Sequence, residues 1–325
     1  MTAPTALFIG GNGIISSACS ALAIERGFDL TLLNRGTDTK RRPILGARSL
    51  VGDADRLEDV PLGDYDVVVN FRSFLPSSVE KDVALFTGKT NQYVYISSAS
   101  AYQKPVARLP ITESTPLHNP FWEYSRNKAA SERVLVDAYN GSGFPATIVR
   151  PSHTYDRTLI PLEGGWTQID RMLRGEPVVV HGDGTSLWTL THNTDFALGF
   201  VGLLNNPRAI GDTFHITSDE ALPWDAIVHM LADAAGVTPE IVHVASETIA
   251  RTIPEWGPGL LGDKAHSVIF DNSKLRSVVP EYVATTPFWR GAREIVEWYL
   301  ESTSRQTVDA GLNAQLDALV AAARA

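Results

Sequence analysis

Short apolar runs alternate with helical patterns through the first 150 residues, and this alternation limits the fold more than any other feature of the chain. The runs carry few charged residues, as expected of strands that are covered on both faces. The pattern predicts an α/β protein built on a doubly wound parallel sheet, the Rossmann arrangement, with ligands beyond the carboxyl ends of the strands. The runs span residues 6–9, 30–33, 49–51, 65–69, 93–96 and 146–149.

The second half of the chain is less regular and predicts a smaller, mostly C-terminal α/β domain that binds the substrate. We expect the dinucleotide-binding domain to comprise residues 1–150 and about 178–215, and the substrate domain to comprise about 151–177 and 216–325. Near the C-terminus, apolar residues recur on one face of a helix. This stripe predicts docking on the body of the protein or on a second copy of the chain, as in a homodimer. It consists of Leu312, Leu316, Leu319, Val320 and Ala323.

Composition excludes several classes of protein. The 325 residues carry 28 basic and 37 acidic side chains, a formal net charge of −9, which disfavours nucleic acid as a partner. The densest basic run, Lys40-Arg41-Arg42, is short. The single cysteine, Cys19, excludes an internal disulfide, and the scattered histidines give no support for a metal site. Without a membrane span or a signal peptide in the sequence, we expect a cytoplasmic protein that acts on a small molecule.

A glycine-rich loop follows the first apolar run and opens a helix. Glycines in this position allow a tight turn and let the backbone approach a pyrophosphate at the helix N-terminus. Ser16 stands where such motifs commonly have a third glycine. The alternative is an ordinary strand–helix turn, but the flanking pattern favours a cofactor site. Its predicted contacts are Gly10, Gly11, Asn12, Gly13, Ile14 and Ile15.

The end of the second apolar run bears on which dinucleotide is bound. An NAD site commonly has an acidic residue there to bind the ribose 2′-hydroxyl, whereas this chain has Asn34 followed by Arg35. A guanidinium is suited to charge-assisted hydrogen bonds with a 2′-phosphate. The pattern therefore favours NADP(H) over NAD(H), and the alternative is a solvated basic loop.

Tyr124 and Lys128 are four residues apart and so share one face of a predicted helix. An ammonium beside a phenol favours the phenolate and lowers the tyrosine pKa, which suits tyrosine for proton transfer. Ser98 lies at the end of the fifth apolar run, where its hydroxyl can hold a reacting oxygen. We expect these three residues to be catalytic, and we expect Ser98 and Ser100 to contact the substrate.

Together these motifs resemble the extended short-chain dehydrogenase/reductase superfamily, also called the NAD-dependent epimerase/dehydratase family. The resemblance implies that Tyr124 is the catalytic acid/base, that Lys128 binds the nicotinamide ribose and that Ser98 orients the substrate oxygen. The further motifs that carry it are Gly52-Asp53, Ile96-Ser97-Ser98, Arg150-Pro151-Ser152, Gly182-Asp183-Gly184 and Asp271-Asn272-Ser273-Lys274. The further cofactor contacts that we expect are Asp53 at the adenine, Ala54, Phe71, Arg72, and Pro151, Ser152 and His153 beside the nicotinamide. Arg72 would lie near the nicotinamide ribose or near a substrate carboxylate.

Departures from the family pattern narrow the function. Dehydratase members carry an Asp-Glu pair just after the catalytic hydroxyl residue, where this chain has Ala99-Ser100, so dehydration is disfavoured. Nucleotide-sugar members clamp the substrate pyrophosphate with arginines at two places. This chain has Leu187-Trp188 at the first and only Lys264 and His266 near the second, which argues against a nucleotide diphosphate. Tryptophans would stack on the substrate instead, unless they belong to the core. The candidates are Trp122, Trp166 and Trp188.

We therefore expect an NAD(P)-dependent oxidoreductase that moves a hydride between nicotinamide and a small sugar-like, polyol or ketone substrate. One alternative is a sugar epimerase with tightly bound NAD. The other is an RNA-binding or regulatory protein on the same fold, because the segments Gly-Gly-Asn-Gly and Asn-Arg-Gly also resemble an atypical branch that includes chloroplast stem-loop RNA-binding proteins. The intact Ser98, Tyr124 and Lys128 favour catalysis, and the net charge disfavours RNA.

Overall fold

A seven-stranded parallel sheet forms the centre of the larger lobe, as predicted from the alternating apolar runs. The computed structural model describes residues 2–36 and 43–325, so the basic run Lys40-Arg41-Arg42 lies outside the described residues. The strand order is β11-β6-β5-β4-β1-β2-β3, and every neighbouring pair is parallel. The strands are β1 (Thr5–Ile9), β2 (Asp29–Asn34), β3 (Arg48–Val51), β4 (Tyr65–Asn70), β5 (Thr90–Ile96), β6 (Ala146–Pro151) and β11 (Thr213–Ile216).

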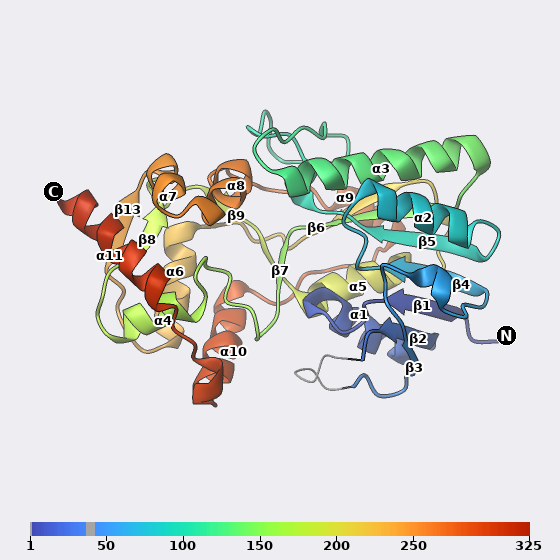
Figure 1. Ribbon diagram of the computed structural model, residues 1–325, viewed down its shortest axis with the longest axis horizontal. Helices are drawn as coiled ribbons and strands as arrows, with labels where there is room; N and C mark the ends of the chain where they lie inside the picture. Colours follow the sequence, from blue (N-terminus) through green and yellow to red (C-terminus); the bar gives the residue numbers. More distant parts are fainter. Residues whose placement is uncertain (1, 37–42) are drawn as a thin grey trace.

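Helices cover both faces of this sheet (Figure 1). Alternate residues of β1 point to opposite faces: Phe8 packs in one apolar cluster with α1 and α5, and Leu7 packs in another with α2 and α3. Both faces of the sheet are therefore buried, which explains why each strand is a continuous run of apolar residues. The helices are α1 (Ile14–Glu25), α2 (Pro76–Phe86), α3 (Glu123–Ser142), α5 (Asn193–Leu203) and α9 (Ser273–Val278).

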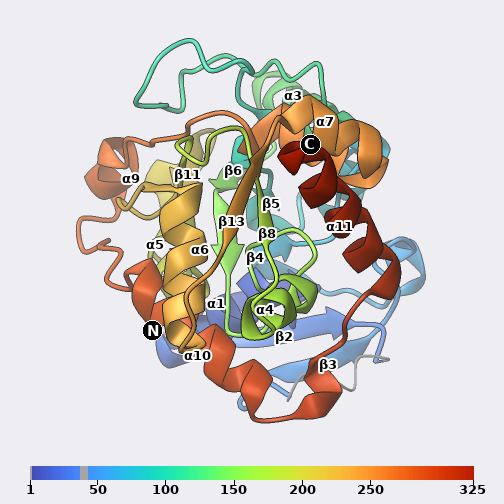
Figure 2. The ribbon, with the colours of Figure 1, turned by 90° about the vertical axis from the view of Figure 1, so that its left-hand side faces the viewer.

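The smaller lobe packs around short strands and helices of the second half (Figure 2). Its strands are β7 (His153–Tyr155), β8 (Val178–His181), β9 (Leu187–Trp188), β10 (Leu190–His192), β12 (Leu222–Pro223) and β13 (Ile241–Val244). Its helices are α4 (Trp166–Leu173), α6 (Trp224–Ala234), α7 (Ser246–Thr252), α8 (Gly257–Gly259), α10 (Phe288–Leu300) and α11 (Ala310–Arg324), with a π-helical turn, η5 (Leu260–Lys264), after α8.

The boundary between the two lobes differs from the predicted one. The strand at Val178–His181 pairs with β13 and not with the central sheet, because Val178 and Val180 are buried in the apolar cluster of the smaller lobe. The helix and strand that follow, α5 and β11, do belong to the larger lobe. The chain also returns there later, since Leu275, Val279 and Tyr282 are buried in the same cluster as α5.

The apolar stripe of the C-terminal helix docks on the body of the protein. Leu316, Leu319 and Val320 of α11 are buried against Val244 of β13 and Ile249 of α7. This contact covers most of the stripe within one chain, whereas Ala323 at its end is exposed. Across residues 2–36 and 43–325, no helix is both long enough and apolar enough to cross a bilayer.

Candidate active site

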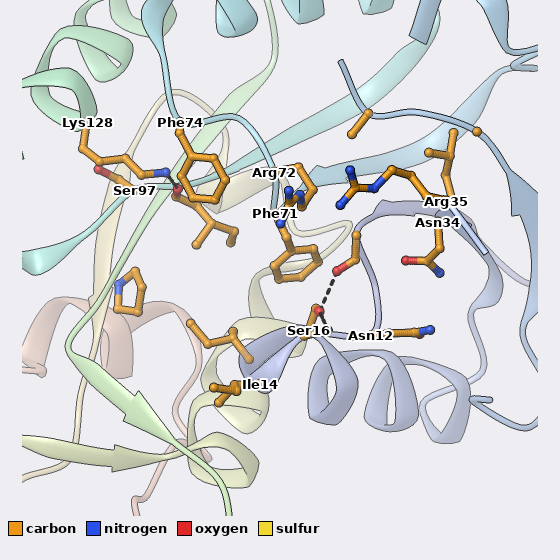
Figure 3. A pocket seen from close by; sticks show the side chains of 18 of the residues that line it. Asn12, Ile14, Ser16, Asn34, Arg35, Phe71, Arg72, Phe74, Ser97 and Lys128 are labelled. Carbon is orange, nitrogen blue, oxygen red and sulfur yellow. Dashed lines mark hydrogen bonds between the residues drawn. The ribbon is translucent and has the colours of Figure 1, made fainter. Parts of the chain in front are cut away.

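The glycine loop lies at the carboxyl edge of the sheet and lines a cleft of about 450 Å³ (Figure 3). Gly10 has φ +85°, a conformation that favours glycine, and a Cβ there would lie 2.6 Å from Cγ of Arg72. A Cβ on Gly11 would lie 2.4 Å from Cδ2 of Leu32. Gly10 and Gly11 therefore lie too close to their neighbours for side chains, and Gly13 is the N-cap residue of α1, so a phosphate can approach the N-terminus of this helix. These residues fit a dinucleotide.

Ser16 stands at the position of the third glycine and stabilises the loop with two hydrogen bonds. Its hydroxyl donates to the Gly10 carbonyl at 2.7 Å and accepts from the Gly13 amide at 2.7 Å. One turn later, the Ser20 hydroxyl donates to the Gly11 carbonyl at 3.0 Å. We had not singled out Ser20 from the sequence, although its spacing of four residues from Ser16 places it on the same helix face.

The cleft brings together most of the predicted cofactor contacts. Gly10, Asn12, Gly13, Ile14, Ile15, Asn34, Arg35, Ala54, Phe71, Arg72, Lys128 and Pro151 all line it. Arg35 has no ion-pair partner among the described residues, so its guanidinium is free to bind an anion. Asp53 is not among the lining residues, and its carboxylate accepts the Asp55 amide at 3.1 Å. Ser152 and His153 also lie elsewhere, in a second cavity.

Lys128 is held beneath the cleft by two backbone carbonyls. Its Nζ donates to the Ile96 carbonyl at 2.7 Å and to the Ser73 carbonyl at 3.0 Å. The ammonium also lies 4.8 Å from the ring centroids of Phe74 and Tyr95. Burial lowers the pKa of Lys128 to about 7, with Glu132 acting in the opposite direction.

Tyr124 lies at the junction of the two cavities and lines both. Burial raises the pKa of its phenol, the Ser98 hydroxyl opposes this shift, and the carboxylate of Asp263 adds to it. The sequence predicted the opposite direction, with Lys128 lowering the Tyr124 pKa. The difference arises because Lys128 directs its protons to backbone carbonyls, with Nζ 5.8 Å from the Tyr124 ring centroid.

Ser98 belongs to a chain of hydroxyl groups. The buried Ser125 hydroxyl donates to Ser100 Oγ at 2.8 Å, and Ser100 Oγ lies 2.9 Å from Ser98 Oγ. Because Ser100 accepts the proton of Ser125, its own proton is available to Ser98. The proton of Ser98 is then left for a group in the cavity. We did not identify Ser125 from the sequence.

The second cavity, of about 280 Å³, lies on the far side of Tyr124 and draws on segments from both lobes. It contains four of the predicted substrate contacts, namely Ser98, Ser100, Trp122 and Trp188. The fifth is misplaced, because Trp166 is buried in the smaller lobe and stacks on Tyr299 with ring centroids 5.3 Å apart. Apolar burial determines the position of this tryptophan.

Two charged residues of η5, Asp263 and Lys264, complete the lining of this cavity. Asp263 accepts from Lys104 Nζ at 2.7 Å, and the Lys104 side chain is 0% exposed. Lys264 Nζ lies 2.8 Å from a carboxylate oxygen of Glu163. No local pattern in the sequence predicts that Asp263 belongs to the site.

The backbone of Lys264 is anchored independently of its side chain. Its carbonyl accepts from His181 Nε2 at 3.0 Å, from Trp224 Nε1 at 3.2 Å and from the Ser186 hydroxyl at 3.3 Å. Asn119 holds the same turn from the other side, since its amide donates to the Gly262 carbonyl at 2.7 Å and to the Ser100 carbonyl at 2.9 Å. The wall formed by η5 is thus tied to both lobes.

The parallel sheet, the glycine loop and the Tyr124–Lys128 pair between two cavities define a dinucleotide-binding protein of the Rossmann class. The sequence model of the NAD dependent epimerase/dehydratase family matches residues 6–217, more than half of the chain. The chain therefore belongs to this family, as the motifs predicted.

Relatives of different function share this sequence pattern. The chain is 26% identical over 260 residues to a chloroplast stem-loop binding protein of 41 kDa from Arabidopsis thaliana, covering 73% of this chain and 65% of that protein. It is 29% identical over 196 residues to a 2′-dehydrokanamycin reductase from Streptomyces kanamyceticus, covering 59% of this chain and 54% of that protein. The matched region thus spans less than two thirds of either relative.

Solved structures share the fold along almost the whole chain. An epimerase from Methanothermobacter thermautotrophicus aligns with a TM-score of 0.74 at 14% identity, covering 92% of this chain and 93% of that one. A dTDP-glucose 4,6-dehydratase from Bacillus anthracis, in complex with NAD, aligns with a TM-score of 0.71 at 18% identity, covering 93% and 98%. These likenesses confirm the predicted fold class.

Proposed function

We propose that this protein is an NADP(H)-dependent oxidoreductase that acts on a small sugar-like, polyol or ketone substrate. The observation that carries the proposal is the position of Tyr124, which lines both the 450 Å³ cleft with its glycine loop and the 280 Å³ cavity. A proton-transfer group at this junction can serve a substrate oxygen in one cavity while the cofactor lies in the other.

Each residue at the junction has a distinct role. Ser98 donates its proton to the substrate oxygen. Its own oxygen can accept the proton of Ser100, which in turn accepts from Ser125. Tyr124 passes its phenolic proton to that oxygen during reduction, or accepts one during oxidation. Lys128 lines the cleft, where the third N–H of its ammonium can hydrogen-bond a ribose. The bound nicotinamide supplies or accepts the hydride.

The residues at the end of β2 support NADP(H) as the cofactor. Asn34 and Arg35 line the cleft, and Arg35 has no carboxylate partner among the described residues. An unpaired guanidinium there is suited to a 2′-phosphate, and Asn34 does not repel one as an aspartate would.

The second cavity supports a compact substrate without a nucleotide. Its volume of about 280 Å³ lies just below the usual range for ligand cavities, and none of the described residues that line it is an arginine that could clamp a diphosphate. One relative is named a 2′-dehydrokanamycin reductase, and a reductase activity agrees with hydride transfer to the substrate.

Two other functions have a specific observation in their favour. A UDP-glucose 4-epimerase from Corynebacterium glutamicum is 27% identical over 164 residues, covering 44% of this chain and 49% of that protein, which favours an epimerase with tightly bound NAD. The stem-loop binding relative favours RNA binding. The intact Ser98, Tyr124 and Lys128 speak for catalysis over RNA binding.

The test begins with mass spectrometry of the cofactor that purifies with the protein. A panel of ring ketones and polyols is then assayed with NADPH or NADP⁺ by nicotinamide absorbance. We expect NADP(H) and a net absorbance change. Product without an absorbance change would identify an epimerase. Stem-loop RNA binding that is structure-selective and tight at physiological salt would replace the enzyme with an RNA-binding protein.

A further inference from the structure

His153 occupies the wall between the two lobes, and its backbone position is fixed by strand pairing. It is the first residue of β7 and lies opposite Leu190 of the parallel strand β10. Trp188, the last residue of β9, packs against it edge to face with ring centroids 6.1 Å apart. Trp188 is itself 4% exposed and is backed by the Trp224 ring at 5.3 Å. Neither ring can therefore turn freely.

The hydrogen bond between these two rings identifies the tautomer of the imidazole. Trp188 Nε1 lies 3.1 Å from His153 Nδ1. An indole N–H can only donate, so Nδ1 must accept and the single proton of a neutral imidazole must reside on Nε2. Burial, with a further contribution from Lys264, lowers the pKa of His153 to about 3, so the ring is neutral at physiological pH.

The protonated nitrogen has no partner among the described residues of the protein. His153 lines the 280 Å³ cavity together with Ser98 and Tyr124. Because Trp188 occupies Nδ1, any polar contact of this ring with a ligand must be made by the Nε2–H group, which requires an acceptor.

We propose that Trp188 holds His153 in its Nε2–H tautomer, so that His153 is a neutral hydrogen-bond donor to an oxygen of the substrate. The proposal rests on the proposed function and refines it: His153 contacts the substrate and not the cofactor, and Trp188 is a positioning residue that acts through His153. Asp263, an acceptor on the same cavity, calls for a hydroxyl or ammonium on another part of the substrate. The substrate class is thus a compact oxygenated ring that also carries a hydrogen-bond donor.

The tautomer can be read directly by long-range ¹H–¹⁵N correlation on the full chain with ¹⁵N-labelled histidine and bound NADP⁺. The His153→Gln variant assigns the His153 signals among the eight histidines. We expect Nδ1 to show the shift of an unprotonated nitrogen and Nε2 that of a protonated one. Trp188→Phe keeps an aromatic ring but removes the donor, and we expect it to give a mixture of tautomers.

Trp224→Phe is the matched control, because it removes an indole N–H from the same cluster that is bonded to the Lys264 carbonyl and not to His153. We expect this variant to keep the wild-type tautomer. A dominant Nδ1–H tautomer in the wild type, or an unchanged spectrum in Trp188→Phe, would overturn the role of Trp188.

The substrate contact is tested with 2-hydroxycyclohexanone, a ring ketone that carries a hydroxyl donor and no nucleotide, titrated into the NADP⁺ complex. We expect the His153 Nε2–H signal to move on binding. His153→Leu should weaken binding of this hydroxyketone about 5- to 100-fold, whereas His153→Gln, which keeps an N–H, should lose only a few fold. A titration that leaves the Nε2–H signal unmoved, or equal losses in both variants, would overturn the contact. These spectra need no turnover, so they can fail while NADPH-dependent reduction is still observed.

Discussion

The cofactor cleft and the substrate cavity meet at Tyr124 but are built in different ways. The cleft is lined by the ends of neighbouring parallel strands and by a loop whose hydrogen bonds are local, such as those of Ser16 to Gly10 and Gly13. The cavity depends on contacts between distant segments, since Lys104 and Asp263 are 159 positions apart and Asn119 and Gly262 are 143 apart. The chemistry of the cleft is therefore specified by short stretches of sequence, and that of the cavity by tertiary packing.

The largest effect should come from breaking the buried ion pair of the cavity. Lys104→Met leaves the Asp263 carboxylate without its partner, and removing one member of a buried pair costs about 3–5 kcal/mol of unfolding free energy. Lys274→Met, which breaks a much more exposed pair with Asp212, should cost about 1 kcal/mol. Denaturant unfolding measures both. Equal losses would show that the Lys104 pair does not support the cavity.

The next largest effect concerns the junction itself. Tyr124→Phe keeps the ring but removes the proton, so kcat for whichever panel compound turns over should fall by about 10²-fold or more. The Kd for NADPH, measured by nicotinamide fluorescence, should hardly change, because the cleft is otherwise intact. Near-normal turnover in this variant would remove Tyr124 from proton transfer.

A smaller effect, confined to the cleft, is expected from Arg35→Ala. A lost charge-assisted hydrogen bond of about 1.5–3 kcal/mol corresponds to roughly 10- to 100-fold weaker NADP(H) binding, with NAD(H) nearly unaffected. Arg48→Ala is the matched control, because Arg48 is also an exposed arginine of this sheet but is paired with Asp29. Calorimetric titration of NADP(H) and NAD(H) measures these affinities. A wild-type protein that binds NAD(H) more tightly would refute NADP(H) as the cofactor.

The last effect is a pH dependence of stability in the cofactor-free protein, which is small within any one pH unit. Lys128 has a pKa of about 7 when folded and an ordinary, higher pKa when unfolded, so between these values the unfolded chain binds more protons. The unfolding free energy should therefore rise with pH above about 7, by at most about 1.4 kcal/mol per pH unit from this group. Lys128→Met should remove this part of the slope. Identical slopes in wild type and variant would contradict the lowered pKa.

The different origins of the two cavities explain what the sequence could predict. The glycine loop, Arg35 and the Tyr124–Lys128 pair lie at strand ends or on one helix face, so local patterns placed them in the cleft. The same patterns identified the strands of the central sheet, because burial on both faces makes each strand continuously apolar.

Residues placed by tertiary packing were harder to predict. Nothing near Asp263 in the sequence distinguishes it from a surface carboxylate, and its site depends on Lys104 in the other lobe. Trp166 and Trp188 were both predicted to contact the substrate. Trp166 is instead buried against Tyr299, whereas Trp188 contacts the ring of His153. Likewise, the apolar run of β8 could have joined either sheet, and only its partner β13 decides which.

The three hydrogen bonds on the Lys264 carbonyl bear on how this protein can change during evolution. Because His181, Ser186 and Trp224 fix the backbone at that point, the turn keeps its path whichever side chain it carries. A single codon change at position 264 can therefore alter the charge of the cavity wall while the backbone keeps its path, and its cost in folding is the loss of the ion pair with Glu163. Libraries that vary this position alone should yield folded proteins with new substrate preferences at high frequency.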